Sequence, residues 1–102
     1  MLLQINKWSL GTWDEKKRKG NIRDHGIDFA DCETIFDPPL ITREDTRDAY
    51  GEQRLQSLGL LGERVVFMVW VERETGPHLV SVRKAEKHEQ RYYIENLRRL
   101  GY

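Results

Sequence analysis

The feature that most constrains the fold is the stretch RVVFMVWVER at residues 64–73. Its richness in β-branched and aromatic residues is typical of a β-strand. Alternate residues of a strand point to opposite faces of a sheet. Here positions 65, 67, 69 and 71 are apolar, and so are positions 66, 68 and 70. The pattern therefore predicts a central strand that is covered on both faces.

Turn signals separate this stretch from further predicted strands at residues 40–43, 53–60 and 78–83. Parallel pairing needs a crossover connection of about a dozen residues or more, and the turns that join the last three strands are too short for one. These strands are therefore expected to pair antiparallel. A short strand within residues 8–13 is expected to join the sheet at an edge.

Helical patterns flank the strands on both sides. Asp14 is a suitable N-cap for a helix over residues 16–24, and Gly26 is a suitable stop signal after it. Asp28 starts a second short helix, FADCETIF, which the following pair of prolines ends. A third helix is predicted over residues 85–100. Its core-facing residues are expected to be Tyr93, Leu97 and Leu100.

Together these elements predict an α+β fold with two N-terminal helices, an antiparallel sheet of three to five strands and a C-terminal helix. The length of 102 residues suits one domain, over residues 1–102. Helices at both ends of the chain would then pack on a single sheet.

Composition argues against several classes of protein. One cysteine, Cys32, rules out a disulfide framework, and with only three histidines a structural zinc site is not expected. We therefore expect neither a metal nor a cofactor. No apolar run approaches the roughly 20 residues of a membrane span. The opening MLLQINKWSLGTW lacks a small-residue cleavage site, so it does not resemble a signal peptide and a cytoplasmic protein is expected.

The formal net charge is zero, because 17 Lys and Arg balance 17 Asp and Glu. The charges are nevertheless uneven along the chain. Residues 28–52 hold eight acidic and two basic residues, whereas residues 83–102 hold six basic and three acidic ones. We therefore expect a polarised surface, although the neutral total by itself does not indicate a nucleic-acid partner. The alternative is that each run is simply a solvated helix face.

Three arginines, Arg54, Arg73 and Arg83, lie near the ends of predicted strands. A guanidinium offers a planar set of five donors and stays charged at any working pH, so converging arginines suit a phosphate. Strand alternation places Ser81 on the same face as Arg83, together with Leu79. The alternative is that these arginines pair with the abundant carboxylates at the edges of the sheet.

Several stretches, taken in order, resemble the BrnT family of bacterial type II toxins. They are WDEKKRKGN, DHGIDF, IFDPPL, YGEQR, LGLLGERVVFMVWVER and SVRKA, followed by Glu89 and Tyr93. The resemblance implies a RelE-like ribonuclease fold and an endoribonuclease that arrests growth by cutting RNA. It also implies a BrnA-like antitoxin with a ribbon-helix-helix part, which forms a hetero-oligomer with the toxin and alone contacts operator DNA.

In this family, strand arginines form the active face, and by motif match these are Arg54, Arg73 and Arg83. Three positions depart from the family pattern. The family commonly has a lysine where this chain has Asp24, and its last strand usually reads RIISARKA, where this chain has His78 and Val82. The departures at Asp24 and His78 each remove a basic residue.

Metal-independent RNA cleavage uses the neighbouring 2′-hydroxyl as nucleophile. Arginines can stabilise the extra negative charge of the transition state, but they are poor proton carriers. Histidine titrates in the useful range, which makes His25, His78 and His88 candidates for proton transfer. We assign His25 a catalytic role beside the three arginines, its alternative being a helix C-terminal cap. Substrate binding is assigned to Ser81, Lys84 and His78.

Glu89 is a further candidate base, and its alternative role is an ion pair with Lys84 or Arg91. Two functions are therefore weighed for the chain. The first is a toxin that cuts RNA without a metal. The second is a non-catalytic toxin homologue that acts as a phosphate- or protein-binding interaction module. A proton-transfer residue on the arginine-bearing face would favour the first.

Overall fold

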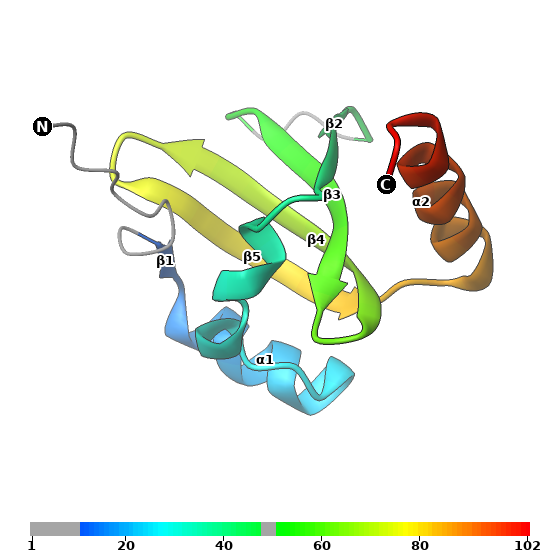
Figure 1. Ribbon diagram of the computed structural model, residues 1–102. Helices are drawn as coiled ribbons and strands as arrows, with labels where there is room; N and C mark the ends of the chain where they lie inside the picture. The colour runs from blue at the N-terminus through cyan, green and yellow to red at the C-terminus, as the bar shows by residue number, and fades with distance from the viewer. Residues whose placement is uncertain (1–10, 48–50) are drawn as a thin grey trace, which may run out of the picture.

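The computed structural model describes residues 11–47 and 51–102. In chain order the elements are β1 (Thr12–Trp13), α1 (Glu15–His25), the 3₁₀ segments η2 (Phe29–Asp31) and η3 (Glu33–Phe36), β2 (Ile41–Asp45), β3 (Arg54–Leu61), β4 (Arg64–Arg73), β5 (Gly76–Lys84) and α2 (Lys87–Arg99). The strands form one five-stranded sheet in the order β1-β5-β4-β3-β2 (Figure 1). The predicted α+β architecture is confirmed.

β4 is the middle strand of the sheet, as its apolar pattern predicts. The β2–β3, β3–β4 and β4–β5 pairs are all antiparallel, which confirms the inference from the short turns. β1 pairs parallel with β5 through Thr12 and Trp13. The predicted edge strand is thus present over these two residues, while residues 8–10 of that prediction lie outside the described residues.

α1 carries the predicted caps. The Asp14 side chain accepts hydrogen bonds from two backbone N–H groups of the first turn, and Gly26 ends the helix with a φ of 68°. The buried residue of α1 is Asn21. Its Nδ2 donates to the carbonyl of Val82, and its Oδ1 accepts from the N–H of Val82, both at 2.9 Å. Asn21 therefore takes the place of a neighbouring strand along the outer edge of β5.

The segment after α1 is not the predicted short α-helix. It forms the two 3₁₀ segments η2 and η3. Its fully buried side chains, Phe29, Cys32 and Ile35, recur every three residues. That period matches the three residues per turn of a 3₁₀-helix better than the 3.6 of an α-helix, which explains the difference.

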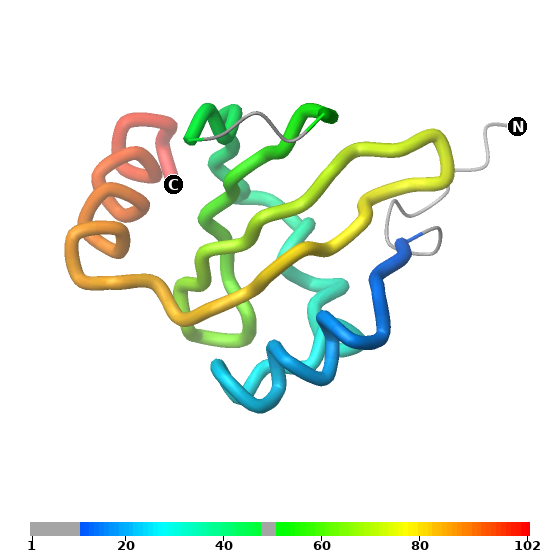
Figure 2. Tube along the Cα trace, turned by 180° about the vertical axis from the view of Figure 1, so that it is seen from behind, coloured from blue at the N-terminus to red at the C-terminus, as the bar shows by residue number. Residues whose placement is uncertain are grey.

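Two apolar clusters occupy opposite faces of the sheet. The cluster against η2 and η3 consists of the buried residues Ile27, Phe29, Cys32, Ile35, Val66, Met68, Trp70, Leu79 and Val82. The cluster beneath α2 consists of Leu58, Phe67, Val69, Ala85 and Tyr93. The two views of the chain trace place α1, η2 and η3 along one side of the sheet and α2 at one end (Figures 1 and 2). Odd and even positions of β4 are thus divided between the faces as predicted.

α2 begins with a capping box in which Glu86 and Glu89 exchange hydrogen bonds with backbone N–H groups. Tyr93 is buried and Leu97 packs against the cluster beneath α2, as predicted. The prediction for Leu100 is wrong, because 66% of its surface is exposed. α2 ends at Arg99, so the helical spacing no longer directs Leu100 toward the sheet.

Candidate functional site

We call the face of the sheet that bears Phe67, Val69 and Val71 of β4 the arginine face. The opposite face, packed against η2 and η3, is the covered face. On the arginine face α2 covers only one end, near Phe67 and Leu58. The view from behind shows no other described helix lying across the remaining length of β4 and β5 (Figure 2). On this face Arg73 is exposed, and the half-buried side chains are Arg54, His78, Ser81 and Arg83, so these polar groups can reach a ligand.

The strand register brings most of the predicted site residues onto this face. Opposite Phe67, Val69 and Val71 stand, in turn, the β5 residues Arg83, Ser81 and His78. Arg73 follows Val71 by two positions on β4. Arg54 precedes Gln56, the partner of Val69, by two positions on β3. Ser81 thus shares the face of Arg83, as strand alternation predicts.

A β-bulge corrects one part of that prediction. The β4–β5 register shifts between Val69 and Trp70, so that Val80 is an extra residue on β5. Leu79 therefore points to the covered face, where it is fully buried, and not to the face of Ser81 and Arg83. One inserted residue leaves the apolar pattern of the strand unchanged, so alternation alone could not locate it.

The three arginines share a face but do not converge on one point. Arg83 lies at the level of Phe67, whereas Arg73 lies six residues further along β4. Six residues of strand span about 20 Å. Arg54, half-buried at the start of β3, lies toward the Arg73 end. The arginine face is therefore elongated, with Arg83 at one end and Arg54 and Arg73 toward the other.

The end near α2 is organised around Arg83. Its Nη1 and Nη2 donate to the two carboxylate oxygens of Glu89 at 2.8 and 3.0 Å, and Nη1 also donates to the carbonyl of Lys84. The guanidinium carbon lies 4.2 Å from the ring centroid of Phe67. These bonds leave the side-on pair of donors, Nε–H and the second Nη2–H, directed away from Glu89. That pair can bind a phosphate through two oxygens.

The partner of Glu89 is therefore Arg83, and neither Lys84 nor Arg91. Their hydrogen bonds lower the pKa of Glu89 and raise the pKa of Arg83. Glu89 is then a carboxylate at neutral pH and a weak proton acceptor. It holds the Arg83 guanidinium in place above Phe67.

Sequence reasoning missed a buried carboxylate on the same face. The side chain of Asp45, fully buried, accepts two hydrogen bonds from the guanidinium of Arg47, both at 2.8 Å. Gln56 also bonds to Asp45 and accepts from Nε of Arg43 at 2.9 Å. The Arg47 bonds, more than any other cause, hold the pKa of Asp45 at about 2. Arg47 lies close enough to Arg83 for their charges to repel each other.

Asp45 thus holds the guanidinium of Arg47 directly, and that of Arg43 only through Gln56. In the sequence, Ile41, Arg43 and Asp45 alternate in a way that places them on one face of a strand. This alternation could have placed Asp45 on the same face as Arg43. The sequence could not have predicted that Asp45 is buried, because acidic loop residues are ordinarily solvated.

The other end of the face carries His78 and Arg73. His78 Nδ1 lies 2.8 Å from the hydroxyl of Thr12, and Arg73 bonds to Glu52 at 3.2 Å. Burial lowers the pKa of His78 below its usual value, and the nearby charge of Arg73 lowers it further. His78 is therefore neutral at pH 7 and does not supply the positive charge of the arginine it replaces.

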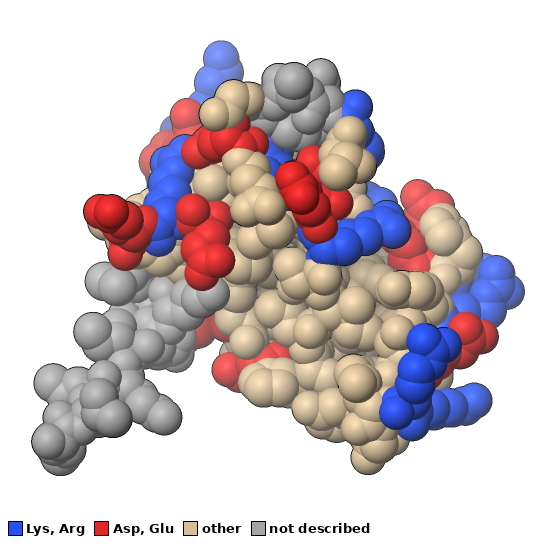
Figure 3. Space-filling view, turned by 90° about the horizontal axis from the view of Figure 1, so that it is seen from above, with Lys and Arg blue, Asp and Glu red and all other residues tan. Residues whose placement is uncertain are grey.

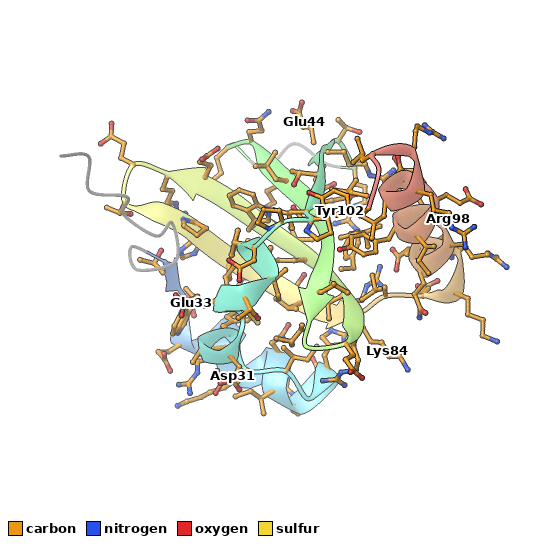
Figure 4. The ribbon with its side chains drawn as sticks, in the orientation of Figure 1. Asp31, Glu33, Glu44, Lys84, Arg98 and Tyr102 are labelled. Carbon is orange, nitrogen blue, oxygen red and sulfur yellow. The ribbon has the colours of Figure 1, made fainter. Side chains whose placement is uncertain are left out.

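Two predicted site residues lie off the arginine face. Lys84 pairs with Val66, so its side chain belongs to the side of the covered face. It stands at the outer end of β5 (Figure 4). His25 is exposed at the end of α1, which packs along the edge of β5. The structure does not bring either residue together with Arg54, Arg73 or Ser81.

Charges of opposite sign are interleaved on the surface. Seen from above, Lys and Arg side chains alternate with Asp and Glu around an uncharged area (Figure 3). Ion pairs such as Arg73–Glu52 and Arg18–Asp28 join carboxylates of the acidic stretch 28–52 to arginines outside it. The uneven charge along the chain is therefore partly cancelled in space.

Several other chemistries find no support in the described residues. Among residues 11–47 and 51–102, no group of three or more His, Cys, Asp and Glu side chains is placed to hold a metal ion. Cys32 is buried, and burial raises the pKa of its thiol to about 12, so it is not a nucleophile at neutral pH. None of the described helices is long and apolar enough to cross a membrane.

Comparisons with known proteins agree with this picture. A family model described as the ribonuclease toxin BrnT of type II toxin-antitoxin systems matches residues 13–89. The chain is also similar to the 1.1 Å crystal structure of the ribonuclease toxin BrnT from Brucella abortus, with 28% sequence identity and a TM-score of 0.55. That similarity covers 74% of this chain and 95% of the Brucella chain. A comparison with curated protein sequences gave no match.

Proposed function

Because the chain belongs to the BrnT family of ribonuclease toxins of type II toxin-antitoxin systems, we propose that it cuts RNA on its arginine face without a metal ion. The observation that supports this proposal is the fixed guanidinium of Arg83. Glu89 holds it at one end, Phe67 lies beneath it, and its side-on donors remain for a phosphate.

The reaction proceeds by attack of a 2′-oxygen on the adjacent phosphorus. The P–O5′ bond breaks as the new bond forms, leaving a 2′,3′-cyclic phosphate on one fragment and a 5′-hydroxyl on the other. The 2′-hydroxyl proton passes to a base, and the 5′-oxygen receives a proton. Arg83 stabilises the added charge on the phosphorane, because its donors are already oriented.

Proton transfer falls to a histidine in this proposal. His88 lies in the first turn of α2. It lines the same cavity as Glu89 and Phe67, the two residues that contact Arg83. His78 stands at the far end of the face. We therefore assign the proton-transfer role to His88, and we assign Arg54 and Arg73 to flanking phosphates, with Ser81 between the two ends.

The antitoxin completes the proposed function. A type II toxin has a protein antitoxin, and we propose a BrnA-like one with a ribbon-helix-helix part. It would cover the arginine face in a hetero-oligomer and alone contact operator DNA. The setting of this pair would be the cytoplasm, where the RNA substrate is.

The test uses the purified chain and a 5′-labelled RNA, with and without EDTA. Cleavage that persists in EDTA, gives 2′,3′-cyclic phosphate ends and is blocked by a 2′-deoxy nucleotide at the cut supports the proposal. His88→Ala should slow cleavage while leaving RNA binding unchanged. RNA that is bound but left intact would instead favour the non-catalytic interaction module.

A further inference from the structure

We propose that the cavity between α2 and the sheet binds a nucleobase of the RNA, next to the phosphate held by Arg83. This inference rests on the proposed function and names a substrate subsite of the same face. The cavity has a volume of about 280 Å³. It is lined by Ile41, Thr42, Arg43, Gln56, Ser57, Leu58, Phe67, His88, Glu89 and Tyr92.

The walls of the cavity are suited to an aromatic heterocycle. Its floor includes the apolar side chains of Ile41, Leu58 and Phe67. Tyr92 stands on the α2 side with half of its surface exposed. Nucleobases recognised in single-stranded RNA commonly stack on such aromatic side chains. Tyr92 lines the cavity and half of its surface is exposed, so its ring is available to stack on a base.

The rim of the cavity carries groups that can hydrogen-bond to a base edge. Nε of Arg43 donates to Gln56, which fixes the guanidinium and leaves its terminal nitrogens for another acceptor. His88 is exposed at the opposite side. An apolar slot with a few fixed polar groups is the usual composition of a small-molecule site. Here those groups include both donors and acceptors, as a base requires.

The cavity also adjoins the proposed phosphate position. Phe67 contributes to its floor and lies 4.2 Å below the guanidinium of Arg83, while Glu89 lines the cavity and binds that guanidinium. A nucleotide whose phosphate contacts Arg83 would thus have its base beside the opening. The arrangement connects the two subsites through shared side chains.

A second cavity, of about 390 Å³, provides a comparison. It adjoins Trp70 on the covered side and is lined by Phe36, Asp37, Leu40, Thr42, Leu55, Trp70 and Glu72. Its charged residues are two carboxylates, with no Lys or Arg among the lining residues. These carboxylates would repel the RNA backbone. The larger cavity is therefore the poorer candidate for a base site, and the charge of the lining residues, not the volume, decides between the two.

Most of the cavity's lining residues, Phe67 among them, lie within the family match at residues 13–89. Tyr92 lies beyond the end of that match, so the aromatic side chain on the α2 side of the cavity comes from a part of the chain that the match does not include. This makes base preference a property to be measured on this chain.

The test measures binding of small probes to the full chain by ¹H–¹⁵N NMR titration. The probes are the four nucleoside 5′-monophosphates and ribose 5-phosphate, which lacks a base. We expect at least one mononucleotide to bind about 10-fold more tightly than ribose 5-phosphate, the effect of one stacked base. Tyr92→Ala should abolish that advantage. Tyr102→Ala, which removes an exposed tyrosine that does not line the cavity, should preserve it.

The inference is overturned if no mononucleotide binds better than ribose 5-phosphate, or if Tyr92→Ala and Tyr102→Ala bind nucleotides alike. It is likewise overturned if Tyr92→Ala weakens only antitoxin binding, since the cavity would then serve a protein. RNA cleavage assayed on the same preparation separates the two proposals. Base-dependent binding without cleavage contradicts the ribonuclease proposal alone, and cleavage without base-dependent binding contradicts the cavity alone.

Discussion

The two faces of the sheet use the same alternating strands for different purposes. On the covered face, η2 and η3 bury Phe29, Cys32 and Ile35 completely against β4 and β5. On the arginine face, α2 covers one end and carboxylates hold guanidiniums at the surface, as in the Arg83–Glu89 pair. Stability is thus expected to reside on the first face and RNA chemistry on the second. Predictions that separate stability from activity test this division.

The largest expected effect is on the covered face. Phe29→Ala removes a ring with no exposed surface, and it should lower the free energy of unfolding by about 4 kcal/mol. Urea denaturation followed by circular dichroism measures this. Arg83→Ala provides the comparison, because losing a partly exposed ion pair and a cation–π contact costs only about 1 kcal/mol. Equal losses in the two variants would show that the division of roles is wrong.

The second effect is on the arginine face. Arg83→Ala should reduce the rate of RNA cleavage by about 10²-fold, because a fixed donor to the developing charge is lost. Arg64→Ala is the matched control, since Arg64 is an exposed arginine of β4 opposite Leu61, at the turn to β3. Single-turnover cleavage of labelled RNA measures both. A comparable loss in Arg64→Ala would mean that overall charge, and not the position of Arg83, drives the reaction.

A third comparison uses two carboxylates, one for each face. Asp28 bonds to Arg18 and caps η2, whereas Asp45 holds Arg47 on the arginine face. Both have a pKa of about 2, held down chiefly by hydrogen bonds from those arginines. A lowered pKa stabilises the folded state above the ordinary carboxyl pKa, and this contribution is lost as the pH falls toward about 2.

Asp28→Asn and Asp45→Asn should each lose less stability than the wild type between about pH 5 and about pH 2. Only Asp45→Asn should also weaken RNA binding, because it releases Arg47. Acid denaturation and an RNA titration at neutral pH measure the two properties. A loss of RNA affinity in Asp28→Asn would contradict the separation of the faces.

The smallest expected effect concerns salt. The logarithm of RNA affinity should fall linearly with the logarithm of salt concentration, by about 0.7 for each phosphate contact on a single strand. Arg83→Ala should reduce this slope by about that amount, and Arg64→Ala should leave it unchanged. Titrations at several salt concentrations measure the slope. An unchanged slope in Arg83→Ala would remove Arg83 from the phosphate contacts.

The sheet could be predicted from the sequence because its signals are local. Residues 64–73 form β4 at the predicted bounds. Apolar residues on both faces and a turn signal at each end favour a strand over any other element there. The α1 caps at Asp14 and Gly26 are local in the same way. The η2 and η3 segments were misjudged, because periods of three and 3.6 residues differ little over so short a stretch.

The site was less predictable because its contacts are not local in sequence. The sequence placed Arg54, Arg73 and Arg83 near strand ends, but their shared face and their separation along the strands appear only in the register. The Arg83–Glu89 pair depends on where α2 returns to the sheet. The burial of Asp45 likewise depends on the pairing of β2 with β3. Neither leaves a periodic pattern in the chain.

One measurement tests the central claim directly: the mapping of a non-cleavable RNA, with 2′-deoxy nucleotides, onto the backbone amides of the full chain by NMR. The claim predicts shifts at Arg43, Gln56, Arg83 and Glu89 on the arginine face, with Ala30 and its neighbours in η2 unaffected. Arg83→Ala should weaken the binding that produces these shifts. Shifts centred on α1, η2 and η3, with the arginine face unchanged, would contradict the account.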